Sequence, residues 1–236
     1  MANQPKKLLS VAEAEAIVRK SGAGRKIEAV PLLEALGRVI AEDVVAPEPS
    51  PRFTNSAMDG FAVRWEDVQY AEAARPAVLT IIGESQAGAP FDGIIETGKA
   101  ARINTGGMLP EGADTVVPIE DVEIQSNSVR ILAAKKREQN VRFGGEEFEK
   151  GESVLKKASV MGPAHLGLLS SLGISSINVY IRPRVALVVT GAELISFPDP
   201  VKPWQIRDSN RVMLSALVMQ AGGFVVLSKR VGDDLE

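Results

Sequence analysis

The segment from Pro47 to Pro51 constrains the fold of this chain most strongly, because three of its five residues are proline. Proline lacks a backbone N–H donor and restricts the preceding residue to extended conformations, so the segment cannot form a helix. It must reach Phe53 as extended chain, and the apolar run Phe61–Val63 beyond it is typical of a strand. The chain therefore has to reverse direction between these two stretches.

The residues of this reversal indicate more than a simple turn. Three small polar side chains there can bond to nearby backbone: Asn55, Ser56 and Asp59. Gly60 is expected to adopt a positive φ, and Phe53 and Met58 are expected to anchor the loop by apolar contacts. Asp59 would then be held in place, and a held carboxylate indicates a site. The alternative for the dipeptide alone is an ordinary Asp-Gly turn.

Composition excludes several classes of function. With 236 residues, 45% of them hydrophobic, the chain can form one large domain or two to three small ones. A net charge of -3 without a basic run argues against a nucleic-acid partner. Cysteine is absent, which excludes disulfides, zinc–thiolate sites and thiol nucleophiles and fits a cytoplasmic protein. No apolar run reaches transmembrane length, and residues 1–7 show no targeting signal, so we expect no membrane partner.

The N-terminal part predicts packing elements. Ser10 and Glu13 form a capping box for a helix that ends near Gly22. A short second helix is expected from Pro31 through Leu36, with Gly37 ending it. No residue here is of a catalytic type, so this part is interpreted as scaffold or oligomer surface.

Residues 51–140 predict a small β-rich domain, in which glycine and proline separate five short strands: Ala77–Ile82, Ala100–Ile103, Thr115–Pro118, Val122–Ile124 and Val129–Leu132. The second strand ends in the paired-glycine loop Arg102–Gly107. Such a loop can leave backbone amides and the side chains of Asn104 and Thr105 free to bind an oxyanion, although glycine pairs after strands are usually plain turns.

Two segments follow before a change of pattern at Pro183. The loop Val141–Glu147 carries one basic residue and a pair of carboxylates, a combination that is usually solvated. A helix is expected from Pro163 through Leu172, closed by Gly173. His165, in its first turn, is interpreted as a surface or packing residue.

The C-terminal part predicts a strand, a helix and a second strand. Val185–Val189 is a continuous apolar run, as expected of a parallel strand covered on both faces, and Phe224–Leu227 follows a helix that ends at Gly222. A right-handed crossover makes the two strands parallel, so the loops after them open on one edge, where ligands bind. Three carboxylates are therefore predicted to converge there: Glu193, Asp233 and Asp234.

The hexapeptide from Asn55 to Gly60 (NSAMDG) resembles the signature of the molybdopterin molybdenumtransferases, the MoeA family that includes the E domain of gephyrin. Three further motifs match this family in the same order: residues 31–38 (PLLEALGR), 102–106 (RINTG) and 190–194 (TGAEL). The resemblance extends from about Leu8 to the end of the chain.

The resemblance implies a multidomain α+β fold. Residues 1–50 and 141–180 would form an elongated α/β dimerisation domain, with a small β-rich domain inserted at 51–140. Residues 181–236 would begin an α/β molybdopterin-binding domain built on a parallel sheet. The family continues after Asp234 with a Ser-Gly-Gly loop, a Lys-Pro-Gly element and a C-terminal β domain, so we expect a truncated domain and an incomplete enzyme that is inactive alone.

The resemblance also implies a function in molybdenum cofactor biosynthesis. Family members are homodimeric transferases that insert molybdate into adenylylated molybdopterin and release AMP in a step that needs a divalent metal. Carboxylates that face an anionic substrate require a cation between them, and Mg²⁺ is expected because it prefers oxygen ligands.

Site residues carry over by position. Asp59 and Glu193 would position metal or molybdate, Thr105 would donate to an oxyanion, and Asp233 or Asp234 would hold Mg²⁺ or the phosphate side. Six further residues would bind the substrate: Asn55, Ser56, Gly106, Glu147, Thr190 and Gly191. Three positions depart from the family pattern: Glu147 and Ala192, where aspartate is usual, and Phe61, where tyrosine is usual. For each carboxylate the alternative is a solvated loop acid.

Two alternative functions stay open on the sequence. The chain could be a noncatalytic dimerisation or scaffold module, as the receptor-clustering relative gephyrin suggests. It could also be a pterin- or nucleotide-binding module that performs no chemistry.

Overall fold

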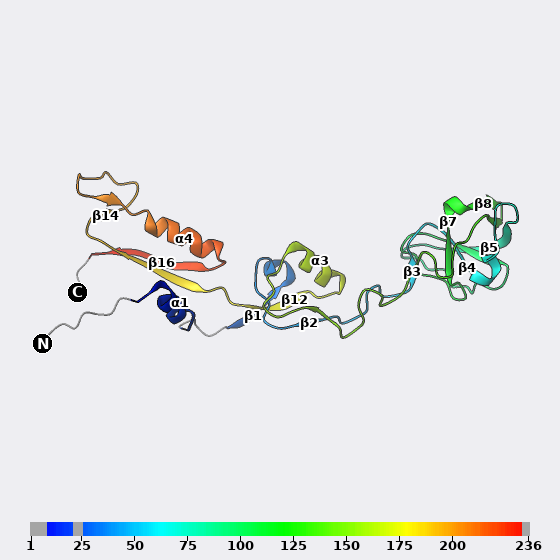
Figure 1. Ribbon diagram of the computed structural model, residues 1–236, viewed down its shortest axis with the longest axis horizontal. Helices are drawn as coiled ribbons and strands as arrows, with labels where there is room; N and C mark the ends of the chain where they lie inside the picture. The colour runs from blue at the N-terminus through cyan, green and yellow to red at the C-terminus, as the bar shows by residue number, and fades with distance from the viewer. Residues whose placement is uncertain (1–8, 21–25, 233–236) are drawn as a thin grey trace. The chain divides into compact units, whose positions relative to one another are not determined.

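The computed structural model describes residues 9–20 and 26–232, and these form an α+β protein (Figure 1). Contacts group the chain into two compact units. Unit 1 comprises Met1–Asp43 and Leu155–Glu236, and unit 2 comprises Val44–Val154. The division into residues 1–50 with 141–180, 51–140 and 181–236 stays a prediction.

Unit 2 is built on a six-stranded sheet of order β7-β4-β6-β5-β9-β8. Its strands are β4 (Gly60–Val63), β5 (Ala77–Ser85), β6 (Lys99–Ile103), β7 (Thr115–Pro118), β8 (Val122–Gln125) and β9 (Ser128–Ile131). Neighbouring strands are antiparallel except for β5 and β6, which are parallel. All five strands predicted for residues 51–140 are present.

Strand β5 continues past its predicted end at Ile82. The register against β6 shifts between Ile81 and Gly83, which marks a bulge. The ring of Phe91 lies where a side chain at Gly83 would be, with only 2.1 Å between the ring and an added Cβ. Glycine here therefore makes room for an aromatic ring and does not end the strand.

Unit 2 has a hydrophobic core cluster on each face of this sheet, because successive residues of a strand point to opposite faces. Ala62, Ile103 and Val116 form one cluster, and the other contains more residues. The buried members of this larger cluster come from five strands and from the short helix α2 (Trp65–Val68): Phe61, Val63, Val68, Leu79, Ala100, Val117, Val129 and Ile131. Burial of each large side chain contributes about 1.5–3 kcal/mol. Strand β9 shows the alternation that places such residues in the core: Val129 and Ile131 are buried, while Ser128 and Arg130 are partly exposed.

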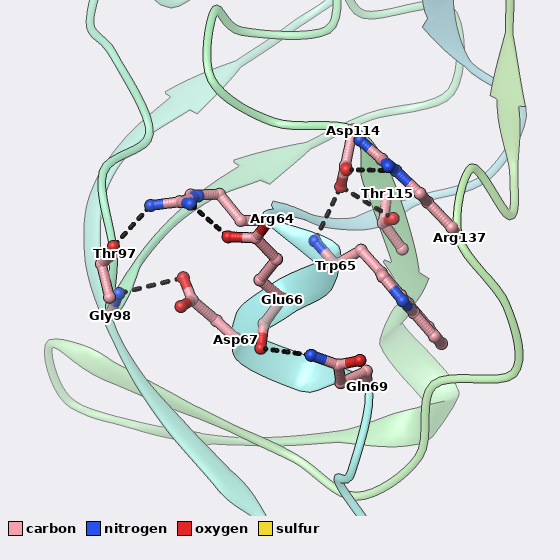
Figure 2. A network of polar contacts seen from close by, with 10 residues as sticks. All are labelled: Arg64, Trp65, Glu66, Asp67, Gln69, Thr97, Gly98, Asp114, Thr115 and Arg137. Carbon is pink, nitrogen blue, oxygen red and sulfur yellow. Dashed lines mark hydrogen bonds and ion pairs between the residues drawn. The ribbon is translucent and has the colours of Figure 1, made fainter.

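The side chain of Asp114, the residue before β7, caps the start of α2. Arg64 makes no side-chain capping bond, and Asp114 Oδ1 instead accepts from the backbone amide of Trp65 at 2.7 Å. Asp114 also accepts from Thr115 Oγ1 at 3.0 Å and, through Oδ2, from Arg137 Nε at 2.9 Å (Figure 2). A distant side chain thus satisfies an amide at the start of this helix and ties it to the segment that contains Arg137.

Unit 1 begins with α1 (Val11–Lys20), where Ser10 and Glu13 form the predicted capping box: Ser10 N donates to Glu13 Oε2 at 2.8 Å, and Glu13 N to Ser10 Oγ at 3.2 Å. The predicted end near Gly22 lies outside the described residues. Strand β1 (Ile27–Pro31) then pairs antiparallel with β12 (Ser176–Tyr180).

The helix expected from Pro31 through Leu36 is only a 3-10 turn, η1 (Leu32–Ala35). Pro31 still belongs to β1 and lies opposite Ser176, so helical geometry can start only after it. Gly37, at φ +70, turns the chain away shortly afterwards. Between these two limits there is room for a single turn.

Helix α3 (Pro163–Ser171) matches its prediction, with Leu172 as its C-cap and Gly173 at φ +71. Nδ1 of His165 accepts from the backbone amide of Gly162 at 3.1 Å. His165 is partly exposed, as expected of a surface or packing residue. Its bond to Gly162 also caps the start of this helix.

The predicted strand, helix and strand form the last part of unit 1. Strands β13 (Arg184–Thr190) and β16 (Phe224–Val231) are parallel, and α4 (Asn210–Gln220) connects them. The expectation that β13 is covered on both faces was wrong for the described residues, because its exposure alternates along the strand. Helix α4 packs on both strands, and Val188 on β13 is 54% exposed.

Three short strand pairs complete the elements: β2 (Val44–Val45) with β11 (Ser153–Leu155), β3 (Asn55–Ser56) with β10 (Val141–Arg142), and β14 (Leu194–Ile195) with β15 (Ile206–Arg207). The 3-10 turn η2 (Ile119–Asp121) links β7 to β8. Within residues 9–20 and 26–232, none of the helices has both the length and the apolar character needed to cross a membrane.

Gly60 has a different role from the positive φ that its sequence context predicts. It is the first residue of β4, and a Cβ added to it would lie 2.0 Å from the carbonyl oxygen of Val117 on β7. Backbone atoms of a neighbouring strand cannot move aside as a flexible side chain can. Only glycine therefore permits this close approach.

We predict that Gly60→Ala lowers the free energy of unfolding of unit 2 by about 3 kcal/mol, because β4 and β7 must separate locally. Denaturation followed by Trp65 fluorescence, in a Trp204→Phe background, measures this change. The matched control is Gly167→Ala on α3, where an added Cβ meets nothing within 4 Å and should raise helix stability by up to about 1 kcal/mol. Wild-type stability of Gly60→Ala would contradict the assignment.

Candidate functional site

Three segments that are far apart in the sequence meet around the turn that follows the proline-rich stretch. Ser56 N donates to Gly107 O at 3.0 Å, and Gly106 N donates to Ser56 O at 2.8 Å. On the other side, Ala57 N donates to Asn140 O at 2.9 Å, and β3 pairs with β10. The predicted residues Asn55, Ser56 and Gly106 therefore lie in one loop cluster of unit 2.

Asp59 and Thr105 are in direct contact in this cluster. Asp59 Oδ1 accepts two hydrogen bonds from Thr105, one from the backbone amide at 2.7 Å and one from the hydroxyl at 3.0 Å. These bonds, the amide first, lower the pKa of the Asp59 carboxyl below its usual value, with smaller contributions from the Asn104 side chain and the charge of Arg102. Asp59 is thus an exposed carboxylate that is held ionised.

Polar contacts, and not the predicted apolar anchors, fix this loop. Phe53 and Met58 are 43% and 40% exposed, so the expectation that they pin it was wrong. Instead, the buried Ser56 hydroxyl donates to Met58 O at 2.6 Å and accepts from Met58 N at 3.2 Å. The side chain of Asn55 donates to Phe53 O at 3.1 Å. Such local side-chain bonds satisfy the backbone of a tight turn directly.

The prediction of free amides in the glycine loop was also wrong. Thr105 N binds Asp59, Gly106 N binds Ser56 O, and Gly107 N binds Asn104 O at 2.8 Å. The loop does present donors to an anion, because the backbone amide and the hydroxyl of Thr105 both donate to one oxygen. That anion is the carboxylate of Asp59 itself.

Glu147 lies in a second charged cluster near β10. Its Oε1 accepts from Arg142 Nη2 at 2.6 Å, and its Oε2 accepts from Ser50 Oγ at 2.7 Å. Arg142 also donates through Nε to Glu146 at 3.2 Å, so it carries both members of the carboxylate pair. The sequence showed the charges but not Ser50, which lies 97 residues earlier and is placed only by the fold.

In unit 1, the loop after β13 contains Thr190, Gly191 and Glu193. Thr190 ends the strand opposite Val231 on β16, so the two parallel strands do end together. Gly191 has φ +146, and the Glu193 carboxylate oxygens would lie 2.9 and 3.0 Å from a Cβ added there. Glu193 is exposed. Asp233 and Asp234 lie outside the described residues, so the convergence of three carboxylates stays a prediction.

Asp208 is a buried carboxylate that the sequence did not single out. It is 2% exposed, accepts from Arg211 N at 3.0 Å and pairs with Arg211 Nε at 3.0 Å. Both contacts lie at the start of α4. Asp208 therefore stabilises that helix terminus and is not assigned to the site.

Asp59 has the donor chemistry that Mg²⁺ prefers, which is one or two carboxylates with water or phosphate in the other positions. It is exposed and ionised. Glu147 does not fit while Arg142 and Ser50 occupy its oxygens. In the part of the chain that the structure describes, no group of three or more His, Cys, Asp or Glu side chains is arranged to hold a metal ion.

We predict that Thr105→Val raises the pKa of Asp59 toward the ordinary value of about 3.9, because one of its two Thr105 bonds is lost while the backbone bond remains. Because the pKa of Asp59 is lower in the folded protein than in the unfolded chain, these bonds stabilise the fold fully above the unfolded pKa. Their contribution is lost as the pH falls through the folded pKa. Carboxyl ¹³C NMR titration measures the shift, with Asp43, whose pKa is also lowered, as the internal control. An unchanged Asp59 titration would refute the role of the hydroxyl.

This chain is similar to known proteins that are longer than it, and it matches only part of each of them. It is 38% identical over 226 residues to molybdopterin molybdenumtransferase 2 of Mycobacterium tuberculosis, covering 96% of this chain and 56% of the relative. It is 37% identical over 218 residues to the molybdopterin molybdenumtransferase of a Nostoc species, covering 92% and 50%. The chain thus spans about half the length of the curated relatives it matches.

A solved structure agrees with these relatives. The crystal structure of the molybdopterin biosynthesis moeA protein from Pyrococcus horikoshii OT3 superposes with a TM-score of 0.84 at 36% identity, covering 89% of this chain and 56% of that one. The family model for the MoeA N-terminal region (domain I and II) matches residues 9–173, which include the Asp59–Thr105 contact. The resemblance found in the motifs is confirmed, and the chain belongs to the MoeA family of molybdopterin molybdenumtransferases, as an N-terminal portion.

Proposed function

We propose that this chain forms the N-terminal part of an enzyme of molybdenum cofactor biosynthesis, a transferase that inserts molybdate into adenylylated molybdopterin and releases AMP with the help of Mg²⁺. The observation that carries the proposal is the Asp59 carboxylate, held ionised by Thr105 within the family's signature loop. The names of the relatives, molybdopterin molybdenumtransferase, support the reaction class.

The local chemistry follows from charge. Molybdate and phosphate are anions, so the Asp59 carboxylate can approach them only through a cation. Bound at Asp59, Mg²⁺ would neutralise negative charge and polarise the phosphoanhydride. Thr105 keeps Asp59 charged and oriented, and Ser56 fixes the turn that carries it. Thr105 serves here as a positioning residue, whereas the sequence suggested a direct contact with an oxyanion.

The remaining site residues keep their proposed roles. Asn55, Gly106 and Glu147 contribute to the substrate-binding side of unit 2. Glu147 takes part in this through Arg142, whose guanidinium it orients. Thr190, Gly191 and Glu193 supply the loop after β13, and Asp233 and Asp234 bind the metal or the phosphate side.

We also propose the domain organisation of the family. A β-rich domain (51–140) is inserted into an elongated dimerisation domain (1–50 and 141–180), and residues 181–236 begin an α/β domain. The parallel pair β13 and β16, joined by α4, supports the last assignment. A cytoplasmic setting is part of the proposal and agrees with the absence of cysteine.

The test measures molybdenum insertion by the chain alone and by a chimaera in which the C-terminal part of the Pyrococcus horikoshii protein continues it. We predict no insertion by the chain alone and insertion by the chimaera. Asp59→Asn in the chimaera should reduce the rate about a hundredfold or more, about 3 kcal/mol of barrier, because asparagine keeps the turn but removes the charge.

Asp92→Asn is the matched control, since Asp92 is an exposed acid of the same unit outside the loop cluster, and it should insert at the wild-type rate. Thermal midpoints of both variants check that folding is retained. A folded chimaera without insertion, or an Asp59→Asn chimaera that works at full rate, would contradict the proposal and favour a binding or scaffold module.

The dimer forms a separate prediction, supported by α1. This ten-residue helix buries no residue within the described chain, and its Val11 and Val18 are 86% and 71% exposed. Helices of this length need tertiary packing in water, so a second copy is the proposed cover. We predict that light scattering at micromolar concentration gives the mass of two chains.

Val18→Asp should shift this mass toward one chain, whereas Val78→Asp should not. Val78 is exposed to a similar degree, at 62%, but it lies on β5 of unit 2. A monomer mass for the wild-type chain, or equal effects of both variants, would rule out the proposed interface.

A further inference from the structure

A second concave surface of unit 2 adjoins the Asp59 loop. It is a cavity of about 590 Å³, within the size range of small-molecule sites. Met58, Pro118 and Asp121 line one part of it, and four residues of the turn 135–140 line the rest: Lys135, Lys136, Gln139 and Asn140. Met58 precedes Asp59 directly, and Ile119 N donates to Asp59 O at 3.1 Å, so the cavity and the signature loop share their backbone.

Buried partners fix the turn that carries the two lysines. Gln139, which is 7% exposed, accepts through Oε1 from the amides of Lys135 at 2.7 Å and Lys136 at 3.3 Å. The fully buried Thr115 hydroxyl accepts from Glu138 N at 3.2 Å. The backbone that presents the lysines is therefore preorganised.

A third contact attaches the same turn to the network around α2. Arg137 Nε donates to Asp114 Oδ2 at 2.9 Å, and Asp114 in turn holds Trp65 and Thr115 (Figure 2). The charge of Arg137 is therefore paired within unit 2. The neighbouring Lys135 and Lys136 form no ion pair among the described residues.

The lining combines three chemistries. Two ammonium groups that form no ion pair within residues 9–20 and 26–232 favour an anion, and phosphate is the anion that lysine commonly binds. Met58 and Pro118 offer apolar surface, and a thioether packs well against a planar ring. The Asp121 carboxylate can accept from N–H or O–H groups of such a ring or of a sugar.

We propose that this cavity binds a phosphorylated heterocycle, a nucleoside monophosphate or a pterin phosphate, with the phosphate on Lys135 and Lys136 and the ring against Met58. The proposal rests on the proposed function, whose substrate carries a phosphoanhydride between two such ring systems. It extends the site beyond the signature loop to a turn whose residues no motif marked.

The methyl groups of ¹³C-labelled methionine report binding directly. Met58 lies in the cavity, while Met213 on α4 belongs to unit 1 and serves as an internal control. The probes are AMP, neopterin monophosphate, adenosine and inorganic phosphate. AMP or neopterin monophosphate should shift the Met58 resonance, and adenosine and phosphate should bind about tenfold more weakly or worse. The stronger of the two phosphorylated probes identifies the ring.

Lys135→Ala with Lys136→Ala should raise the dissociation constant of the better probe about tenfold or more, because two positive charges are lost while the amides bound by Gln139 remain. Lys135→Arg with Lys136→Arg should retain binding. The matched control is Lys156→Ala with Lys157→Ala, an adjacent lysine pair in unit 1, which changes the net charge equally.

Failure has a distinct signature. A Met58 resonance that no phosphorylated probe shifts, or equal weakening by the two alanine pairs, overturns the proposal. The insertion assay with the chimaera is independent of this one. Binding at Met58 without insertion would overturn only the proposed function, and insertion without binding at Met58 would overturn only this inference.

Discussion

Backbone hydrogen bonding on both sides of residues 54–59 holds the candidate site of unit 2 together. Thr54 and Ser56 carbonyls accept from Leu109 and Gly106, the Ala57 amide donates to Asn140 O, and the Asp59 carbonyl accepts from Ile119. Each of these groups would otherwise need water or a side chain, because an unpaired backbone group is costly. A loop pinned on both edges gives Asp59 one position, which a loop bonded on one edge would not do.

The Asp59 carboxylate is itself the anion that the donors of the Thr105 loop bind. The Thr105 amide and hydroxyl converge on one carboxylate oxygen, and this arrangement lowers the pKa of Asp59 without burying it. A buried acid tends to take up a proton, whereas an exposed acid bound by donors remains charged. Such a carboxylate retains its charge for a cation, which suits the anionic substrates proposed for this site.

Sequence patterns predicted the elements well because the patterns act locally. The strands of residues 51–140, the helix after Gly162 and the parallel pair near the C-terminus follow from alternation, capping and apolar runs within a few residues. The short η1 departs from prediction because Pro31 pairs with Ser176 in a strand, a partner 145 residues later in the chain that periodicity cannot show.

The contacts among the candidate site residues of unit 2 could not be predicted from the sequence. Asp59 and Thr105 are separated by 46 positions, and Ser50 and Glu147 by 97, so their bonds depend on the folded sheet. Phe53 and Met58 suggested apolar anchoring, but the turn is small enough for Ser56 and Asn55 to satisfy it with polar bonds. The sequence context of Gly60 suggested a positive φ, whereas the structure needs glycine there because the Val117 carbonyl of β7 leaves no room for a Cβ.

Strand β7 links the two surfaces proposed for ligands. The Val117 carbonyl lies against Gly60, directly after Asp59, and the adjacent Val116 carbonyl accepts from Asn140 Nδ2 at 3.0 Å. The Val116 amide also binds Gln139 O at 3.1 Å, so the same two residues of β7 hold the signature loop and the lysine turn. Because strands in a packed sheet move together, the spacing between Asp59 and the turn is set by β7 and not by either loop. A ligand that contacts both surfaces would therefore meet a separation that is fixed before it binds, which reduces the ordering cost of binding.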